Sequence, residues 1–272
     1  MQANSIGFIG AGNMAGSLVR GLIAKGTPVS AIHVADIDSG KLAELTTECG
    51  IQASSNEQIA NNCEVIVLAV KPQVMETVCR NLHAGSQNPL FVSVAAGITL
   101  TQLGNWLADT AAIVRCMPNT PALVGQGASG LFANDKVDSQ QRTTAQQLLD
   151  AVGISAWVDN EADLDLVTAV SGSGPAYFFL FMEAMQNTAQ EMGMSAELAR
   201  KLVLQTASGA SALAQNSDVD VAELRRRVTS PGGTTERAIN TFEAGRLRQL
   251  VETALHAARD RSIELAQETD KD

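Results

Sequence analysis

A glycine-rich segment near the N-terminus has the residue types and spacing of a phosphate-binding turn. Gly10, Gly12 and Ala15 form a G-x-G-x-x-A pattern directly after an apolar run at residues 6–9. The first glycine permits a tight turn, the second lets the backbone approach a pyrophosphate, and the small alanine lets the next helix pack on the strand. Because free N–H groups at a helix N-terminus bind anions, the pattern predicts a dinucleotide site.

A carboxylate follows at the distance expected for a ribose contact. Asp36 ends the second apolar run, 32–35, about 20 residues past the glycines. There it can hydrogen-bond the ribose hydroxyls of the adenosine and repel a 2′-phosphate, which favours NADH over NADPH. Alternatively, Asp36 caps the next helix, whose pattern starts near Ser39. The sequence is compatible with both interpretations.

Two more strand ends fall where a doubly wound sheet opens toward its cofactor. Lys71 and Pro72 follow the run 65–70, and Ala95, Ala96 and Gly97 follow the run 90–94. Carboxyl ends of parallel strands line the cofactor crevice, so we expect these segments beside the dinucleotide. For Lys71, a solvated lysine at a strand end is an equally favoured interpretation.

A second loop with anion-binding potential lies in the C-terminal half. It contains Ser230, Gly232, Gly233, Thr234 and Thr235. Adjacent glycines let successive N–H groups converge, and threonines at the start of the next helix add hydroxyl donors, so a small carboxylate would fit. An ordinary helix cap after a Gly-Gly turn is an equally good interpretation.

The elements that position these loops divide the chain into two halves. Up to about residue 158, β-rich runs alternate with amphipathic helical patterns, which predicts a doubly wound parallel sheet in an α/β domain over residues 1–160. Ser55 with Gln58 and Thr99 with Gln102 have the spacing of capping boxes at two helix starts. After Asn160 good helix formers predominate, which predicts an all-helical domain over 161–272. The expected strands are 6–9, 32–35, 65–70, 90–94, 112–115, 128–132 and 155–158, and the expected C-terminal helices are 162–170, 175–192, 196–214, 221–228, 236–243 and 247–266.

The helix expected from Pro175 points to an oligomer. Residues 177–182 are all apolar, so the helix has apolar side chains on nearly every face and must be buried all round. A helical domain of about 110 residues has limited room to cover it. We therefore expect an obligate homo-oligomer, at least a dimer, with an interface made of helices.

Composition excludes several classes of protein. Of the 272 residues, 45% are apolar and 18% charged, which excludes disorder. The formal net charge of −10 repels a phosphate backbone, so we expect no nucleic-acid partner. The longest apolar run, residues 176–182, has seven residues, far short of the roughly 20 that span a bilayer, so we expect no membrane contact.

Cysteine and histidine usage predicts neither disulfides nor a metal site. The four cysteines include no CxxC pair, and the three histidines are isolated. No basic segment precedes an apolar one near the N-terminus, so we expect no secretory signal and a cytoplasmic protein.

Taken together, these segments resemble the Δ1-pyrroline-5-carboxylate reductase family, which performs the last step of proline synthesis. The likeness runs almost end to end and implies a Rossmann-type domain followed by a helical dimerisation domain, often assembled into rings of dimers. The segments that carry it are 6–15 (IGFIGAGNMA), 69–72 (AVKP), 95–97 (AAG), 115–121 (RCMPNTP), 170–177 (VSGSGPAY) and 228–235 (VTSPGGTT).

The resemblance implies a reaction. Hydride passes from the nicotinamide C4 to the C=N carbon of L-1-pyrroline-5-carboxylate and gives L-proline. Because the protonated imine accepts hydride well, catalysis is mostly positioning and charge placement. The family commonly uses NADPH, often with a small polar residue where this chain has Asp36. NADPH is therefore the expected cofactor, with NADH as the alternative.

The resemblance also implies residue roles, on active sites shared by two subunits. Thr235 bonds the ring nitrogen as the catalytic residue, while Gly232, Gly233 and Thr234, in the loop that begins at Ser230, hold the substrate carboxylate. The cofactor contacts are Ile9, Gly10, Ala11, Gly12, Asn13, Met14, Asp36, Asn56, Ala69, Val70, Lys71, Pro72, Ala95, Ala96 and Gly97.

Two other functions fit parts of the pattern. A β-hydroxyacid or imine reductase of the same plan relies on a lysine in its helical half, but here Lys201 lies on a patterned helix and looks structural. A nucleotide sensor without turnover has no need of the loop at 230–235.

Overall fold

The computed structural model describes residues 5–83 and 88–269, so the first residues of the segment searched for a secretory signal lie outside it. The chain forms two compact units. Unit 1 runs to Ser173 and also includes the residues from Ala258 onward, whereas unit 2 is Gly174–Ala257. The division into domains at residue 160 stays a prediction.

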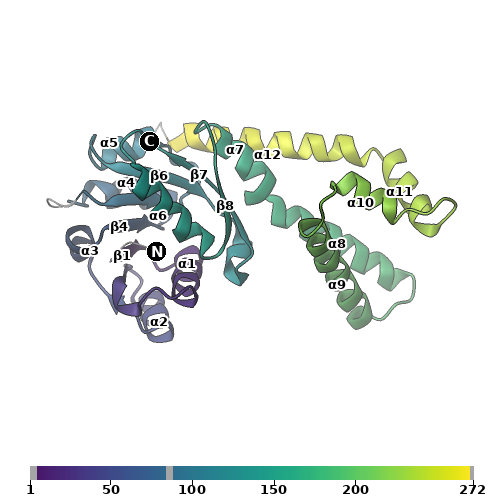
Figure 1. The fold of residues 1–272 in the computed structure, drawn as a ribbon, viewed down its shortest axis with the longest axis horizontal. Helices are drawn as coiled ribbons and strands as arrows, with labels where there is room; N and C mark the ends of the chain where they lie inside the picture. Colours follow the sequence, from purple (N-terminus) through teal and green to yellow (C-terminus); the bar gives the residue numbers. More distant parts are fainter. Residues whose placement is uncertain (1–4, 84–87, 270–272) are drawn as a thin grey trace. The chain divides into compact units, whose positions relative to one another are not determined.

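Unit 1 is built on a sheet that lies among the helices of this unit (Figure 1). The sheet has eight strands in the order β3-β2-β1-β4-β5-β6-β7-β8. Every neighbouring pair is parallel except β6 and β7. That pair is antiparallel because a short 3-10 turn, Thr120–Val124, joins the strands in place of a crossover helix. The strands are β1 (Ile6–Ile9), β2 (Ile32–Ala35), β3 (Gln52–Ala53), β4 (Val65–Leu68), β5 (Leu90–Ser93), β6 (Ala112–Met117), β7 (Gly127–Ala133) and β8 (Gly153–Trp157).

The sheet confirms the predicted doubly wound α/β fold, including all seven expected strands to within two residues at either end. Only β3 was not predicted. Both of its residues are exposed, so no apolar run marks it in the sequence.

Helices cover both faces of this sheet. The helices α3 and α5 start at the two predicted capping boxes. A third box, Asp138 with Gln141, starts α6 and was not predicted. The helices of unit 1 are α1 (Asn13–Ala24), α2 (Ser39–Cys49), α3 (Asn56–Asn62), α4 (Pro72–Arg80), α5 (Leu100–Trp106), α6 (Ser139–Asp150) and α7 (Asp163–Val167), with a 3-10 turn at Val29–Ala31.

Two hydrophobic cores lie on opposite faces of the sheet. Phe8 packs with α1, α2 and α6 on one face, whereas Ile9 packs with α3, α4 and α5 on the other. Each large side chain buried in this way stabilises the fold by about 1.5–3 kcal/mol. Burial on both faces explains why the strands are continuous apolar runs in the sequence.

The cysteines are packed and unpaired, as predicted. Cys63, Cys79 and Cys116 are buried, and none of the four cysteines forms a disulfide. Burial raises the pKa of the Cys63 thiol to about 11 and that of Cys79 to about 12, so neither is a thiolate nucleophile near neutral pH.

The small-residue segment 171–175 continues the helical path instead of interrupting it. After α7 the chain makes a π-helical turn, Thr168–Gly172, and enters α8 (Gly174–Glu191). A Cβ at Gly172 would lie 2.6 Å from Met117 Cε, the end of a flexible side chain that can move aside. A widened helical turn therefore joins the two helices expected at 162–170 and 175–192.

Unit 2 consists of helices with little core of their own. It contains α8, α9 (Ala196–Gln215), α10 (Val221–Arg227), α11 (Thr234–Ala244) and the first part of α12 (Leu247–Thr269). The rings of Phe181 and Phe242 lie 5.9 Å apart between α8 and α11. On α8, Phe178 is 66% exposed and Leu180 is 67% exposed. One copy of the chain therefore leaves much of α8 uncovered.

By length and composition alone, the helical stretch Asp163–Glu191 could also cross a membrane. It has 29 residues and contains an 18-residue window with a mean hydropathy of 1.2. The expectation of no membrane contact stays a prediction.

The capping box of α6 generates a stability prediction. Asp138 Oδ1 accepts from the Gln141 N–H at 2.7 Å, and Gln141 Oε1 accepts from the Asp138 N–H at 3.1 Å. Asp138→Ala removes the cap and lowers the free energy of unfolding by about 1 kcal/mol. Urea unfolding measures it, with Asp135→Ala as control because that carboxylate is exposed and pairs only with Lys136. Equal midpoints for both variants would contradict the assignment.

Candidate functional site

The glycine turn lies where the ends of three strands meet. Gly10, directly after β1, has φ +105°. Its N–H group donates to the Ala35 carbonyl at the end of β2, at 2.7 Å. A Cβ at this position would lie 2.6 Å from the Ala69 carbonyl oxygen, just beyond β4. Only glycine fits here, both because φ is positive and because the backbone of two neighbouring strands is so close.

The next glycine opens the turn toward solvent. A Cβ at Gly12 would meet nothing within 4 Å, so the backbone here can be approached closely. Gly12 is also the N-cap of α1 and supplies no side-chain cap to the first N–H groups of that helix. An open approach above uncapped helix amides is what a pyrophosphate needs.

Asp36 fastens this turn from the end of β2. Its Oδ2 accepts from the Ala11 N–H at 2.6 Å, and its Oδ1 accepts from the Asp38 N–H at 2.8 Å. The alternative role as helix cap belongs to Asp38, whose Oδ1 accepts from the Gly40 and Lys41 N–H groups. Asp38 takes that role because it directly precedes the first residue of α2. Asp36 therefore places a carboxylate charge beside the glycine turn.

The other predicted cofactor residues also follow the carboxyl ends of strands. Ile9 is the last residue of β1, while Asn13 and Met14 begin α1. Asn56 is the first residue of α3, behind its cap Ser55. Ala69 and Val70 lead from β4 to Lys71, the exposed N-cap of α4, and to Pro72, its first residue. The segment of Ala95, Ala96 and Gly97 leaves β5, with Gly97 at φ +75°. Since β1, β2, β4 and β5 are neighbours in the sheet, these segments share one edge of it.

The loop that follows β6, residues 118–121, is held in place by Asn119. The Asn119 side-chain amide donates to the Ser171 carbonyl at 3.0 Å, and its Oδ1 accepts from the Ala128 N–H at 2.9 Å. The loop thus joins β7 to the π-helical turn within unit 1.

In unit 2, the glycine loop at 230–235 already binds a carboxylate, that of Glu236. The Gly232 N–H donates to Glu236 Oε2 at 2.8 Å, and the Gly233 N–H donates to the Ser230 carbonyl at 3.0 Å. Gly232 has φ +71°, which favours glycine there. Sequence reasoning missed Glu236, although an acidic residue in the first turn of α11 was a visible signal.

The threonines of this loop begin α11. Thr234 and Thr235 are its first two residues, and both are exposed. The N-cap, Gly233, carries no side chain to bond the first amides of the helix. These amides and the two hydroxyls form a set of hydrogen-bond donors suited to a small anion.

Within residues 5–83 and 88–269, no three His, Cys, Asp or Glu side chains gather into a group that could hold a metal ion.

Two family models match the two parts of the chain. Residues 5–97 match a family described as NADP oxidoreductase coenzyme F420-dependent. Residues 161–265 match the pyrroline-5-carboxylate reductase dimerisation family.

Relatives match over nearly the whole chain. A pyrroline-5-carboxylate reductase from Pseudomonas aeruginosa is 52% identical, over 98% of this chain and 99% of the relative. One from Pasteurella multocida is 43% identical, over 97% and 98%. Among solved structures, the pyrroline-5-carboxylate reductase from Coxiella burnetii has a TM-score of 0.93 at 44% identity, covering 97% of this chain and 99% of that one. The Plasmodium falciparum pyrroline carboxylate reductase with NADP bound has a TM-score of 0.86 at 30% identity, covering 98% and 99%.

The contacts of Asp36 generate a prediction about cofactor choice. Asp36→Asn keeps an oxygen acceptor in the turn and removes the negative charge that repels a 2′-phosphate. We expect the ratio of NADPH to NADH affinity to rise roughly tenfold. Fluorescence titration with both nucleotides measures the ratio, and Asp38→Asn is the matched control because asparagine also caps α2. An unchanged ratio in Asp36→Asn would show that this carboxylate does not select the cofactor.

Proposed function

The chain belongs to the pyrroline-5-carboxylate reductase family, and from this premise we propose how its two units divide the reaction. The protein is an NAD(P)H-dependent oxidoreductase that acts on a C=N bond and reduces L-1-pyrroline-5-carboxylate to L-proline, the last step of proline biosynthesis. The observation that carries this function is the 52% identity to a pyrroline-5-carboxylate reductase over 98% of the chain.

The residues of unit 1 fit a dinucleotide. The open backbone at Gly12 and the uncapped amides of α1 suit a pyrophosphate. When bound, the reduced nicotinamide supplies the hydride for the C=N carbon. We propose NADPH as the preferred cofactor, because a relative of the same fold carries NADP and the matching N-terminal family is described as an NADP oxidoreductase. NADH remains the alternative that the Asp36 carboxylate favours.

The loop of unit 2 fits the substrate. We propose that Ser230, Gly232, Gly233 and Thr234 surround the substrate carboxylate, with the Gly232 and Thr234 N–H groups as donors while the Gly233 N–H keeps the loop closed on the Ser230 carbonyl, and that the Thr235 hydroxyl hydrogen-bonds the ring nitrogen. The support is the uncapped start of α11 and the carboxylate of Glu236 that the Gly232 N–H already binds. When the substrate binds, its carboxylate accepts a hydrogen bond from the Gly232 N–H, either in place of Glu236 or together with it. Catalysis then consists of orienting the protonated imine for hydride transfer.

The protein is a homodimer. The exposed apolar face of α8 gives the physical reason, since a second copy can cover what one chain leaves open. We propose that each active site combines the cofactor turn of one copy with the substrate loop of the other, and that dimers assemble further into a ring. We also propose that the enzyme is cytoplasmic and contacts neither membrane nor nucleic acid, in keeping with its net charge of −10.

Loss of nicotinamide absorbance tests the function. The purified wild-type protein is mixed with pyrroline-5-carboxylate and either NADPH or NADH, and proline formation is measured in parallel. Oxidation of the nucleotide with one proline formed per nucleotide is the expected result. A protein that binds the nucleotide and turns over neither mixture would contradict the function.

Thr235→Ala tests the role of the substrate loop. Loss of a charge-assisted hydrogen bond to the ring nitrogen lowers kcat/KM for pyrroline-5-carboxylate by roughly tenfold or more, about 1.4 kcal/mol. Steady-state kinetics measure it. Thr241→Ala is the matched control on the same helix, because the Thr241 hydroxyl only donates to the Arg237 carbonyl at 3.0 Å. Wild-type kinetics in Thr235→Ala would remove this residue from the mechanism.

A further inference from the structure

The segment from Ala95 to Leu100 borders the nicotinamide half of the proposed cofactor site. In the sheet, β2 lies on one side of β1 and its glycine turn, and β4 and β5 lie on the other. With the pyrophosphate at the turn and Asp36 on the adenosine side, the nicotinamide falls toward β4 and β5. The backbone from Ala95, two residues after the end of β5, to Leu100, the first residue of α5, therefore determines how the nicotinamide is held.

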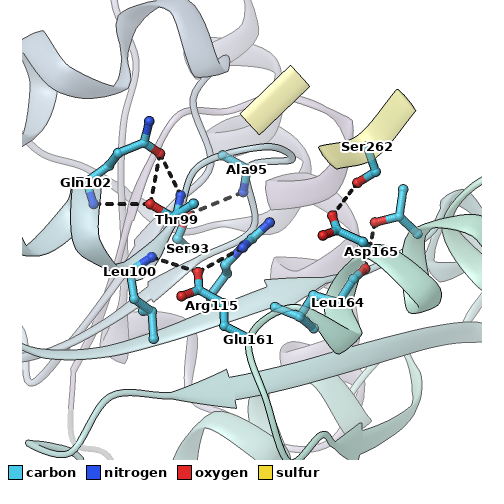
Figure 2. Close-up of polar contacts among 11 residues, drawn as sticks. Ser93, Ala95, Thr99, Leu100, Gln102, Arg115, Glu161, Leu164, Asp165 and Ser262 are labelled. Atoms are coloured by element: carbon cyan, nitrogen blue, oxygen red, sulfur yellow. Dashed lines mark hydrogen bonds and ion pairs between the residues drawn. The ribbon is translucent and has the colours of Figure 1, made fainter. Parts of the chain in front are cut away.

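A half-buried carboxylate, that of Glu161, holds the far end of this segment. Glu161 Oε1 accepts from the Leu100 N–H at 2.8 Å and from Arg115 Nη1 at 2.8 Å, as Figure 2 shows. The Arg115 side chain, on β6, is only 9% exposed, and that of Glu161 is 25% exposed. One carboxylate thus joins β6, the start of α5 and the residues just before α7.

The C-terminal part of α12 also contacts the 95–100 segment and α7. Asp165 Oδ1, on α7, accepts from the Ser262 hydroxyl of α12 at 2.7 Å, and Ser262 is 8% exposed (Figure 2). A Cβ added to Gly97 would lie 3.9 Å from the backbone at Leu265 and Ala266. The C-terminal part of α12 therefore lies against the middle of the segment while Glu161 holds its end.

Stability alone does not explain an ion pair at this place. Because the Arg115 side chain is 9% exposed and that of Glu161 is 25% exposed, desolvation offsets part of their attraction, and well-packed apolar side chains would stabilise as much. The pair also fixes the position of the segment, because the Leu100 N–H must lie within hydrogen-bond distance of the Glu161 carboxylate. The capping box of Thr99 and Gln102 fixes the next turn, but it does not connect the segment to β6.

We propose that Arg115 and Glu161 are positioning residues that hold the 95–100 segment in place against the nicotinamide. This role rests on the proposed function, since it presumes a nicotinamide at the end of β5. Arg115 orients the Glu161 carboxylate, and Glu161 in turn fixes the Leu100 N–H.

Leu100→Pro tests the hydrogen bond without breaking the ion pair. Leu100 is the first residue of α5, where proline is well tolerated, and Thr99 before it is extended, as proline requires. The variant therefore removes little besides the N–H group and the leucine side chain. Leu100→Ala is the matched control, which loses the side chain and keeps the N–H. We expect kcat/KM for NADPH to be roughly tenfold lower in Leu100→Pro than in Leu100→Ala.

Glu161→Ala and Glu161→Gln test the carboxylate. Binding of NADP⁺ and of 2′-phospho-ADP-ribose, which lacks the nicotinamide, is measured for both by calorimetry. Glu161→Ala weakens binding of NADP⁺ roughly tenfold and leaves binding of the fragment unchanged, and Glu161→Gln restores most of the loss because its amide oxygen still accepts.

Three results would overturn the proposal: equal loss for both ligands, equal kinetics in the two Leu100 variants, or lower thermal stability with unchanged binding. If Glu161→Ala fails to fold, the Leu100 pair alone decides. Wild-type turnover, measured separately, distinguishes failure of this proposal from failure of the proposed function.

Discussion

The crowding of backbone at Gly10 is the constraint on which the rest of unit 1 depends. Three neighbouring strands end within a few ångströms of this residue, and their carbonyl groups leave no room for a side chain. The positive φ at Gly10 turns the chain out of β1 so that α1 starts with open amides. The Asp36 carboxylate, just after β2, accepts a hydrogen bond from the Ala11 N–H and so connects the turn after β1 to the end of β2. The proposed cofactor site is therefore a consequence of how β1, β2 and β4 pack.

Unit 2 follows a different principle, because its helices do not bury enough of their apolar surface in one copy. Its exposed apolar side chains lie along α8 and α9, as at Phe178 and Leu202. If a second copy covers them, as we propose, folding, assembly and activity are linked, and the stability of unit 2 depends on protein concentration. The loop at 230–235, by contrast, is organised by its own contacts, because the Gly232 N–H donates to Glu236. The proposed substrate loop is thus preformed within one copy of the chain.

Local sequence patterns predicted most of the fold, but they did not predict the polar contacts between residues far apart in the sequence. Continuous apolar runs located β1, β2 and β4 because both faces of the sheet are covered. The exposed β3 had no such signal, and the antiparallel direction of β7 was not predicted although its strand was. The glycine pattern predicted the turn at Gly10, but not that Asp36 would bond its backbone while Asp38 capped α2. The pairing of Arg115 with Glu161 spans 46 residues of sequence, and neither residue is unusual in its local setting.

The central claim is that one unit holds the cofactor, the other holds the substrate, and two copies complete each site. Mixed dimers test it most directly. A Gly10→Ala chain and a Thr235→Ala chain are co-expressed with different affinity tags, and the dimer is purified through both. If sites combine units from different copies, one site of the mixed dimer carries both changes and the other carries neither, so activity rises well above that of either parent dimer. Activity no higher than that of the parents would contradict the claim and place both units of a site in one chain.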